Sequence, residues 1–440
     1  MSAPRTTSSA GADVVIIGAG VVGSSIALEL SRIGYDVLVA DKAAGVGHGS
    51  TGASSAVVRF NFSTRAGVAA AWESYACWQT WEDHLGLSAE EGSLARYVRS
   101  GLAMLDVDVA PRSTFLPHFA ELEIPFEEWD AATLASRVPG IDVGRYWPPK
   151  RVADDAFWAD SSSTLGAVYT PDGGYVNDPQ LAAQNLATAA AQRGARFVLN
   201  RRVVGIDRVG GRVTGVRLEG EGRISCRVVV NAAGPWSSRV NELAGAGGDF
   251  TVGLRPMRQE VHQVEAPSAL RASPICFADM DLGTYVRPEG TGHLLVGGTE
   301  PECDPMQWVE DPDDVAPNPT ASVFESQVMR AARRLTDLRV PSRPQGVVGV
   351  YDVASDWTPI YDQTDIEGFY VAVGTSGNQF KNAPIIGQFL TAIIDQVENG
   401  VSHDDKPVQF RAPHTGAEID LGVFSRRRVP NSGSSGTVMG

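Results

Sequence analysis

The start of the chain alternates between short apolar runs and an amphipathic segment. Residues 13–17 (Asp-Val-Val-Ile-Ile) and 37–40 (Val-Leu-Val-Ala) each predict a short strand that is covered on both faces. Between them, apolar side chains recur at spacings of four, four and three from Val22 to Ile33, which predicts a helix with one buried face that stops at Gly34. This order of elements predicts a parallel βαβ unit.

Apolar strands and a helix of the same kind are predicted again further along the chain. Asp178 and Pro179 predict the start of an Ala-rich helix that runs to about Arg193 and is closed by Gly194. Strands are predicted at 197–199, 203–206, 213–216, 227–231 and 368–374, and a further helix over 385–397. A Gly-Gly pair at 210–211 marks a hairpin between two of these strands.

The two segments 85–170 and 241–340 differ in composition: they are rich in aromatic residues, proline and alternating apolar and polar positions. This composition predicts an α+β domain with a mixed, largely antiparallel sheet. We therefore predict an α/β protein with a discontinuous Rossmann-type domain, a parallel sheet with flanking helices, and a second domain. The first domain is assigned to residues 12–84, 171–240 and 341–411, the second to 85–170 and 241–340, and flexible tails to 1–11 and 412–440.

Composition and charge narrow the class of partner. The 440 residues include 37 Lys and Arg against 52 Asp and Glu, a net charge of −15, which disfavours nucleic acid and anionic membranes as partners. There is no run of about 18 apolar residues and no signal-peptide-like core in the first residues, so we expect a soluble, cytoplasmic protein. The four cysteines and seven histidines show no ligand-like spacing, and no metal site is predicted.

A phosphate-binding pattern follows the first predicted strand. In Gly18-x-Gly20-x-x-Gly23, the first glycine permits a tight turn, the second lets a pyrophosphate approach the backbone, and the third lets helix and strand pack closely. Asp41, at the end of the second strand, is placed to accept the hydroxyls of an adenosine ribose, which argues against a ribose phosphate. The pattern predicts a dinucleotide and leaves nicotinamide and flavin cofactors open.

Later segments favour a flavin. Residues 47–52 (Gly-His-Gly-Ser-Thr-Gly) come directly after the second strand, and 368–381 form a strand and loop able to cradle a ring system. The layout resembles the D-amino-acid-oxidase superfamily of FAD oxidoreductases, and within it the group of sarcosine oxidases, glycine oxidases and dimethylglycine dehydrogenases. With the glycine pattern, the stretches 172–179, 230–236 and 374–381 carry this resemblance, which covers about residues 12–400.

The resemblance implies a set of residues that bind FAD. These residues surround the pyrophosphate, the ribose, the ribityl chain and the flavin ring. They are Gly18, Gly20, Val22, Gly23, Asp41, Lys42, Gly49, Ser50, Thr51, Ser54, Val204, Ala233, Gly234, Gly377, Asn378, Phe380 and Lys381.

Two cations fall where sarcosine oxidases bind the substrate carboxylate. Arg59 matches an arginine of that group, and its guanidinium can bind a planar carboxylate through two parallel hydrogen bonds, although a surface or pyrophosphate-pairing role stays open. Lys381 matches a lysine of the same site, and it is one of only four lysines in the chain. Tyr351 matches an active-site tyrosine of sarcosine oxidases and stands where glycine and D-amino-acid oxidases use an arginine.

Three other positions depart from the sarcosine oxidases. Gly349 stands where the monomeric enzymes carry the cysteine that is bonded to FAD, so we expect non-covalent FAD. Alignment also puts Leu295 at the position of the oxygen-activating lysine and Thr299 at that of an active-site histidine. Fast reaction with O2 is therefore not implied, and O2 or another electron acceptor re-oxidises the flavin.

The resemblance implies an enzyme in which Arg59, Lys381 and Tyr351 handle an amino-acid substrate. We expect an N-substituted, carboxymethyl-type glycine to transfer hydride from the carbon next to nitrogen to flavin N5, with glyoxylate and an amine as products. The alternatives are a D-amino-acid or glycine oxidase, and a flavoprotein that holds FAD for structure and acts in assembly or interaction.

Overall fold

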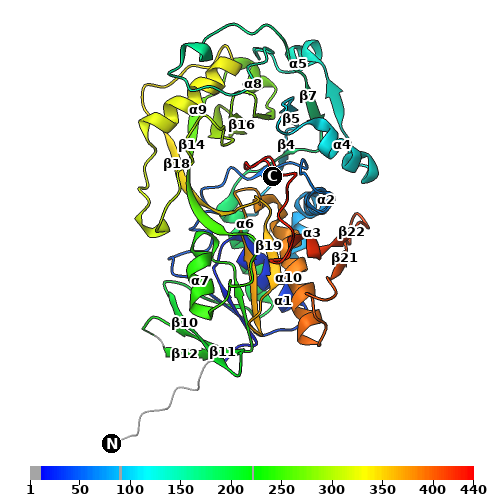
Figure 1. The fold of residues 1–440 in the computed structure, drawn as a ribbon, viewed down its shortest axis with the longest axis vertical. Coiled ribbons are helices and arrows are strands. Elements are labelled where there is room, and N and C mark those ends of the chain that lie inside the picture. Colours follow the sequence, from blue (N-terminus) through cyan, green and yellow to red (C-terminus); the bar gives the residue numbers. More distant parts are fainter. Residues whose placement is uncertain (1–10, 89–91, 221) are drawn as a thin grey trace, which may run out of the picture.

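The computed structural model describes residues 11–88, 92–220 and 222–440. A six-stranded sheet occupies the lower half of Figure 1. In spatial order its strands are β19 (Ile360–Gln363), β20 (Phe369–Val373), β13 (Val228–Asn231), β1 (Val14–Ile17), β2 (Val37–Ala40) and β9 (Arg196–Val198). All neighbours run parallel except β19 and β20, which are antiparallel. The predicted parallel unit around β1 and β2 is confirmed.

Both faces of β1 are covered, which explains its unbroken apolar sequence. Val14 and Ile16 pack in one cluster with the helices α1 (Val21–Arg32), α6 (Pro179–Gln192) and α10 (Ala383–Glu398). Val15 and Ile17 pack on the other side, against β10 (Val203–Val209), β11 (Arg212–Leu218), β12 (Gly222–Ser225) and α7 (Ser237–Ala244). Successive side chains of a strand point to opposite faces, so a doubly covered strand is apolar throughout.

The ends of the predicted helix and hairpin are also confirmed. The Asp178 side chain caps α6 by accepting from Leu181 N at 2.9 Å, with Pro179 in the first turn. Strands β10 and β11 pair antiparallel around Gly210 and Gly211, which both have positive φ.

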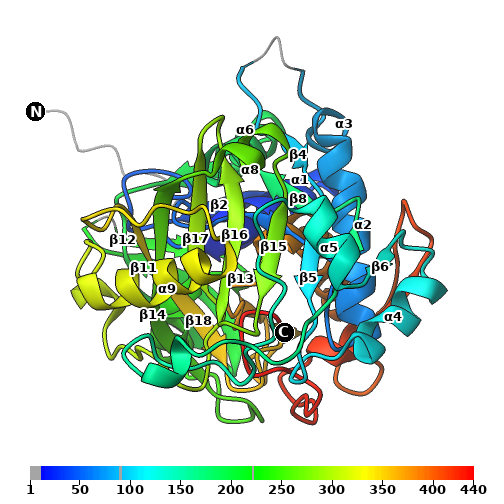
Figure 2. The same cartoon turned by 90° about the horizontal axis from the view of Figure 1, so that it is seen from above.

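A mixed, largely antiparallel sheet of eight strands forms the upper layer (Figures 1 and 2). In spatial order its strands are β18 (Gly346–Ala354), β14 (Leu254–Glu265), β17 (His293–Gly298), β16 (Thr284–Glu289), β15 (Cys276–Asp279), β5 (Leu102–Leu105), β7 (Ala167–Thr170) and β6 (Glu127–Trp129). Only β15 and β5 pair parallel. The predicted α/β class, with one parallel-rich sheet and one mixed, largely antiparallel sheet, is confirmed.

One boundary of the predicted domains is wrong. Residues 341–411 were assigned to the Rossmann-type domain, yet β18 pairs along its whole length with β14 in the eight-stranded sheet. Its partner lies far away in the sequence, so no local pattern identifies the sheet that it joins. The third segment of the Rossmann-type domain therefore begins after Ala354.

The remaining elements surround the two layers. A small sheet contains β3 (Val57–Val58), β8 (Gly174–Val176) and β4 (Tyr97–Arg99), and another contains β21 (Gln409–Arg411) and β22 (Glu418–Asp420). The other helices are α2 (Arg65–Gln79), α3 (Trp81–Leu85), α4 (Arg112–Glu121), α5 (Ala131–Arg137), α8 (Ser268–Ala272) and α9 (Ala321–Arg334), with short 3-10 turns η2 (Asp155–Phe157), η3 (Gly234–Trp236), η4 (Pro312–Asp314), η5 (Phe380–Asn382) and η6 (Leu421–Phe424). In the described ranges, none of the helices combines the length and apolarity that crossing a bilayer requires.

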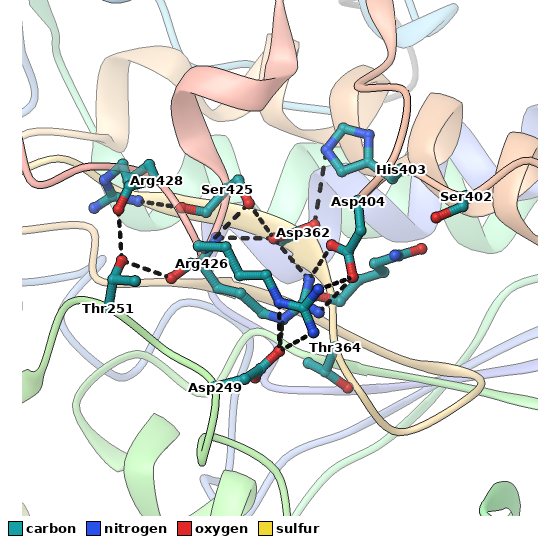
Figure 3. Close-up of polar contacts among 12 residues, drawn as sticks. Asp249, Thr251, Asp362, Thr364, Ser402, His403, Asp404, Ser425, Arg426 and Arg428 are labelled. Atoms are coloured by element: carbon teal, nitrogen blue, oxygen red, sulfur yellow. Dashed lines mark hydrogen bonds and ion pairs between the residues drawn. The ribbon is translucent and has the colours of Figure 1, made fainter.

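The predicted C-terminal flexible tail, 412–440, is wrong. After β22, the chain packs against the six-stranded sheet through Arg426, whose side chain is fully buried. Its guanidinium binds Asp404 at 2.7 Å, Asp249 at 2.8 Å and Asp362 at 3.1 Å (Figure 3). These carboxylates come from three other segments, so the basic run is a structural anchor. Residues 1–10 of the other predicted tail lie outside the described residues.

Candidate functional site

A cavity of about 1120 Å³ lies between the two large sheets. The ends of β1, β2 and β20 and the N-terminus of α1 line it on one side, and residues of β14, β15, β16 and β18 line it on the other. Carboxyl ends of parallel strands are where α/β folds bind dinucleotides. The cavity therefore has the position expected for an extended cofactor whose reactive end reaches the second domain.

The three glycines of the Gly-x-Gly-x-x-Gly pattern stand where neighbouring parts of the chain come too close for a side chain, or nearly so. Gly18 has φ +113°, and a Cβ there would lie 2.3 Å from the Ala232 carbonyl oxygen. A Cβ on Gly23 would lie 2.0 Å from the Gly18 carbonyl oxygen, and one on Gly20 would lie 3.1 Å from Thr51 Oγ1. Gly18 and Gly20 line the cavity, whereas Gly23 holds α1 against β1 and does not.

Asp41 stands at one end of the cavity, where the sequence places the adenosine ribose. Its carboxylate accepts hydrogen bonds from Ala19 N and Ala43 N, both at 2.7 Å. These bonds fix the carboxylate at the cavity wall, and each oxygen keeps a second lone pair for a ligand hydroxyl. The predicted role of Asp41 fits this geometry.

Lys42 lies beside Asp41 but is already engaged by the protein. Its Nζ pairs with Asp313 and lies 3.7 Å from the centroid of the Trp236 ring. Asp313 belongs to η4 of the second domain and also accepts from Trp236 Nε1 at 3.0 Å. Lys42 thus helps to tie the second domain to the rim of the cavity.

The other predicted cofactor residues also line the cavity. They are Val22, Gly49, Ser50, Thr51, Ser54, Val204, Ala233, Gly234, Gly377, Asn378, Phe380 and Lys381. The N-cap of α1 is Gly20, which presents backbone alone to the cavity, and Asn378 Nδ2 is buried without a partner among the described residues. Free donors and a glycine-lined helix N-terminus suit a pyrophosphate and a polar ring edge. The residues present therefore fit FAD.

Arg59 and Lys381 come together at the other end of the cavity. Both side chains are buried, and their charged groups lie 4.8 Å and 4.7 Å from the centroid of the same Phe62 ring. Burial lowers the pKa of Arg59 to about 9, and burial followed by the charge of Arg59 lowers the pKa of Lys381. In the described part of the chain, neither cation pairs with a carboxylate, so the pair attracts an anion.

Tyr351 lies with this pair in the cavity wall. Its ring packs so tightly on Gly377 that a Cβ there would lie 2.3 Å from the ring, and burial raises the pKa of the Tyr351 phenol well above its ordinary value. Gly349, two residues earlier on the same strand, also lines the cavity, and a Cβ at this position would lie 3.1 Å from Ala53 Cβ. The wall at Gly349 thus presents backbone to the cofactor.

Several site residues were not predicted from the sequence. Gln259 and Tyr285 line the cavity from β14 and β16, and Val438 and Met439 line it from the C-terminal segment. Tyr285 Oη lies 2.7 Å from Ser55 Oγ. The alternation of β14 and β16 predicts which residues share a face, but not that the face opens onto a cofactor cavity. The segment before Val438 is rich in Ser and Gly, a composition that does not predict packing against the cavity.

Leu295 and Thr299 do not line the cavity, although the alignment places both at active-site positions. Leu295 lies in β17 opposite Gln263 and Arg287. Thr299 is buried directly after the end of β17. The geometry gives neither residue a contact with the cavity.

One group with metal-ligand chemistry occurs among the described residues. Potential ligand atoms of Glu73, Cys77 and His414 lie within 4.8 Å of one another. Both Glu73 oxygens already accept hydrogen bonds from backbone and side-chain groups of His414 and Thr415. These bonds account for the buried carboxylate as an anchor of the segment near β22.

The cavity and its two walls are typical of flavin-dependent oxidoreductases. The family described as "DAO: FAD dependent oxidoreductase" matches residues 13–393. The chain belongs to this family, so its cofactor is FAD and its class is that of FAD-dependent oxidoreductases.

Comparison with individual proteins agrees with this assignment. The mouse (Mus musculus) FAD-dependent oxidoreductase domain-containing protein 1 is 26% identical over 87% of this chain and 81% of its own length. The glycine oxidase of Geobacillus kaustophilus is 25% identical over 88% of this chain and 93% of its own.

Solved structures share the fold. L-proline dehydrogenase from P. horikoshii has a TM-score of 0.73 at 20% identity and covers 95% of this chain and 98% of its own. Iminodiacetate oxidase from Chelativorans sp. BNC1 has a TM-score of 0.66 at 19% identity and covers 89% and 98%, respectively.

Proposed function

We propose that the protein oxidises an N-substituted glycine, R–NH–CH2–COO⁻, at the carbon next to nitrogen. The observation that carries the proposal is the pair of buried cations, Arg59 and Lys381, against one face of the cavity beside Tyr351. A carboxylate bound there satisfies two charges that have no anionic partner among the described residues.

The residues of the chain contribute binding and orientation. The Arg59 guanidinium offers a planar set of donors and Lys381 a compact charge, which together fix the carboxylate and hence the adjoining methylene carbon. Positioning of this kind contributes up to about 7–11 kcal/mol in model reactions. When bound, FAD supplies the two-electron oxidation. The two cations also lower the pKa of the substrate ammonium, which favours the neutral amine that the reaction needs.

Tyr351 supports a secondary amine as substrate. Glycine and D-amino-acid oxidases of the superfamily place a carboxylate-binding arginine at this position, whereas the sarcosine type uses an arginine and a lysine elsewhere. With the carboxylate on Arg59 and Lys381, oxidation of the methylene carbon gives an imine. Its hydrolysis releases glyoxylate and R–NH2.

The test is anaerobic bleaching of the flavin across a panel of amines. We expect sarcosine and larger N-alkylglycines to reduce the flavin faster than glycine, proline or D-alanine, and mass spectrometry to find glyoxylate. Rapid bleaching by D-alanine without bleaching by any N-alkylglycine would overturn the substrate class. Glycine and an aldehyde as products would reverse the position of C–N cleavage.

A further inference from the structure

The backbone of Val438, which lines the cavity, bridges Arg59 and the partly buried carboxyl group of Glu300, which does not itself line the cavity. Val438 N donates to Glu300 Oε2 at 2.7 Å, and Arg59 donates through a terminal nitrogen to the Val438 carbonyl oxygen at 2.8 Å. One N–Cα–C=O unit of the chain is therefore held by a carboxyl group at its nitrogen end and by a guanidinium at its oxygen end.

This is the pattern of contacts that an amino acid needs. The amine of an amino acid or an N-substituted glycine is one carbon away from its carboxylate, as N is from C=O within one residue. An ammonium donates to a carboxylate, and a carboxylate accepts from a guanidinium. The Val438 backbone thus marks a place whose two ends match the two charged ends of such a substrate.

Glu300 is otherwise unexplained. It follows β17 with φ +49°, a conformation that non-glycine residues seldom adopt and that is often found at functional sites. Its Oε1 accepts from Gln259 Nε2 at 3.0 Å, and among the described residues it has no ion-pair partner. Burial raises the pKa of Glu300 to about 8, close to the range in which an acceptor for an amine proton works best.

The segment that carries Val438 is anchored up to residue 431, and beyond it the chain is held at Val438 by Glu300 and Arg59 and by the buried Met439 side chain. The Arg426 anchor in Figure 3 and the contact of Asn431 Nδ2 with Ser63 Oγ at 3.0 Å hold the chain up to residue 431. From there to Val438, the sequence Ser-Gly-Ser-Ser-Gly-Thr provides small residues and two glycines. Such a sequence moves readily about a fixed anchor.

We propose that Glu300 binds the substrate amine, and that the N–C–COO⁻ unit of the substrate takes the place of the Val438 backbone between Glu300 and Arg59. The proposal rests on the proposed function and adds a residue to it. The segment 432–440 moves aside when substrate enters. In the molecules in which Glu300 is ionised, one proton passes from the bound R–NH2⁺–CH2–COO⁻ to the Glu300 carboxylate, which leaves a neutral amine and a neutral carboxylic acid.

The first experiment measures binding without turnover. 2-Aminoisobutyrate has both charged ends but no hydrogen on the carbon between them, and isobutyrate has the same shape without the amine. In Glu300→Gln we expect 2-aminoisobutyrate to bind at least tenfold more weakly, as seen by perturbation of flavin absorbance, with isobutyrate within twofold of wild type. Glu302→Gln, at a nearby exposed acidic residue, should change neither.

The second experiment addresses displacement of the segment. Val438→Pro removes the N–H that Glu300 accepts, so the segment competes less well and 2-aminoisobutyrate should bind several-fold more tightly. Val438→Ala also removes the valine side chain but keeps the backbone N–H, so it is the matched reference for Val438→Pro. Equal affinities in the two variants would show that substrate and segment occupy different places.

Each result separates this proposal from the proposed function. Equal loss of both ligands in Glu300→Gln, or no loss of either, removes Glu300 from the amine site even if N-alkylglycines bleach the wild-type flavin. If no amine bleaches the wild-type flavin while the selective loss of 2-aminoisobutyrate is observed, the proposed reaction fails and the amino-acid binding site stands.

Discussion

Arg59 and Lys381 are the two residues on which the substrate assignment depends most. Replacing either by Met removes a charge-assisted contact worth about 1.5–3 kcal/mol, so kcat/KM should fall by about tenfold to more than a hundredfold. FAD content should be largely retained because Asp41, Gly18, Gly20 and most other predicted cofactor residues are unchanged. Steady-state kinetics and the ratio of flavin to protein absorbance check both expectations.

Exposed cations of the same type provide the controls for these two variants. Arg339→Met and Lys406→Met remove the same charges from the surface and should leave kcat/KM unchanged. Unaltered kinetics in Arg59→Met and Lys381→Met would remove both residues from the site.

Gly349 predicts that FAD is held without a covalent bond at the ring end. It presents no side chain to the cavity, so no sulfur is available there for a bond to FAD. Acid precipitation should release the yellow colour into the supernatant at about one FAD per chain. Colour that stays with the denatured pellet would demonstrate a covalent link at another residue.

Site residues were predictable from the sequence where the backbone itself makes the site. Gly18 and Gly20 are needed for close approach, and Asp41 follows a strand whose end is fixed by the sheet, so spacing alone identifies them. Gln259 and Tyr285 come from the pairing of distant strands. No local pattern carries that information.

The element after β22 shows how a composition-based expectation fails. A run of three arginines followed by Ser and Gly resembles a solvated tail, but the partners of Arg426 lie at Asp249, Asp362 and Asp404. A charge whose partners are remote in sequence is paired only after the chain has folded. The apolar periodicity of α1 and the capping residues of α6, in contrast, are local and predict both helices correctly.

The Arg426 anchor should contribute strongly to stability. Arg426→Met leaves the buried Asp362 carboxylate without its arginine, whereas Asp249 and Asp404 keep Arg427, and breaking a buried pair in this way costs about 3–5 kcal/mol. Thermal or urea unfolding measures the change in the free energy of unfolding. Arg427→Met, whose side chain is 49% exposed, should cost about 1 kcal/mol or less, and similar losses in the two variants would contradict a special role for Arg426.

For the whole molecule, Glu300 imposes a pH dependence on stability. Its pKa is about 8 in the folded protein and about 4.3 in an unfolded chain. Between these values the unfolded state has lost the proton while the folded state keeps it, so stability falls as the pH rises from about 4.3 to about 8. Glu300→Gln has no such titration, so the difference in melting temperature between this variant and wild type should increase in favour of the variant from pH 5 to pH 8.

The control for this measurement is Glu302→Gln, which keeps the titrating group. Its melting temperature should follow that of wild type across the same pH range. Parallel curves for wild type and Glu300→Gln would show that Glu300 titrates alike in the folded and unfolded states.

The order in which the strands enter the central sheet constrains how this protein is made. β1 and β2 are synthesised first, but β1 also pairs with β13, and β13 in turn with β20, which follows most of the second domain in sequence. While the second domain is being translated, the central sheet of the nascent chain is therefore incomplete. Its apolar strands are exposed, and such exposure promotes aggregation. Ribosome-stalled chains ending before residue 369 should be cleaved by protease within α1, and chains that extend beyond α10 should be protected there. Protection in the shorter chains would mean that the first βαβ unit folds alone.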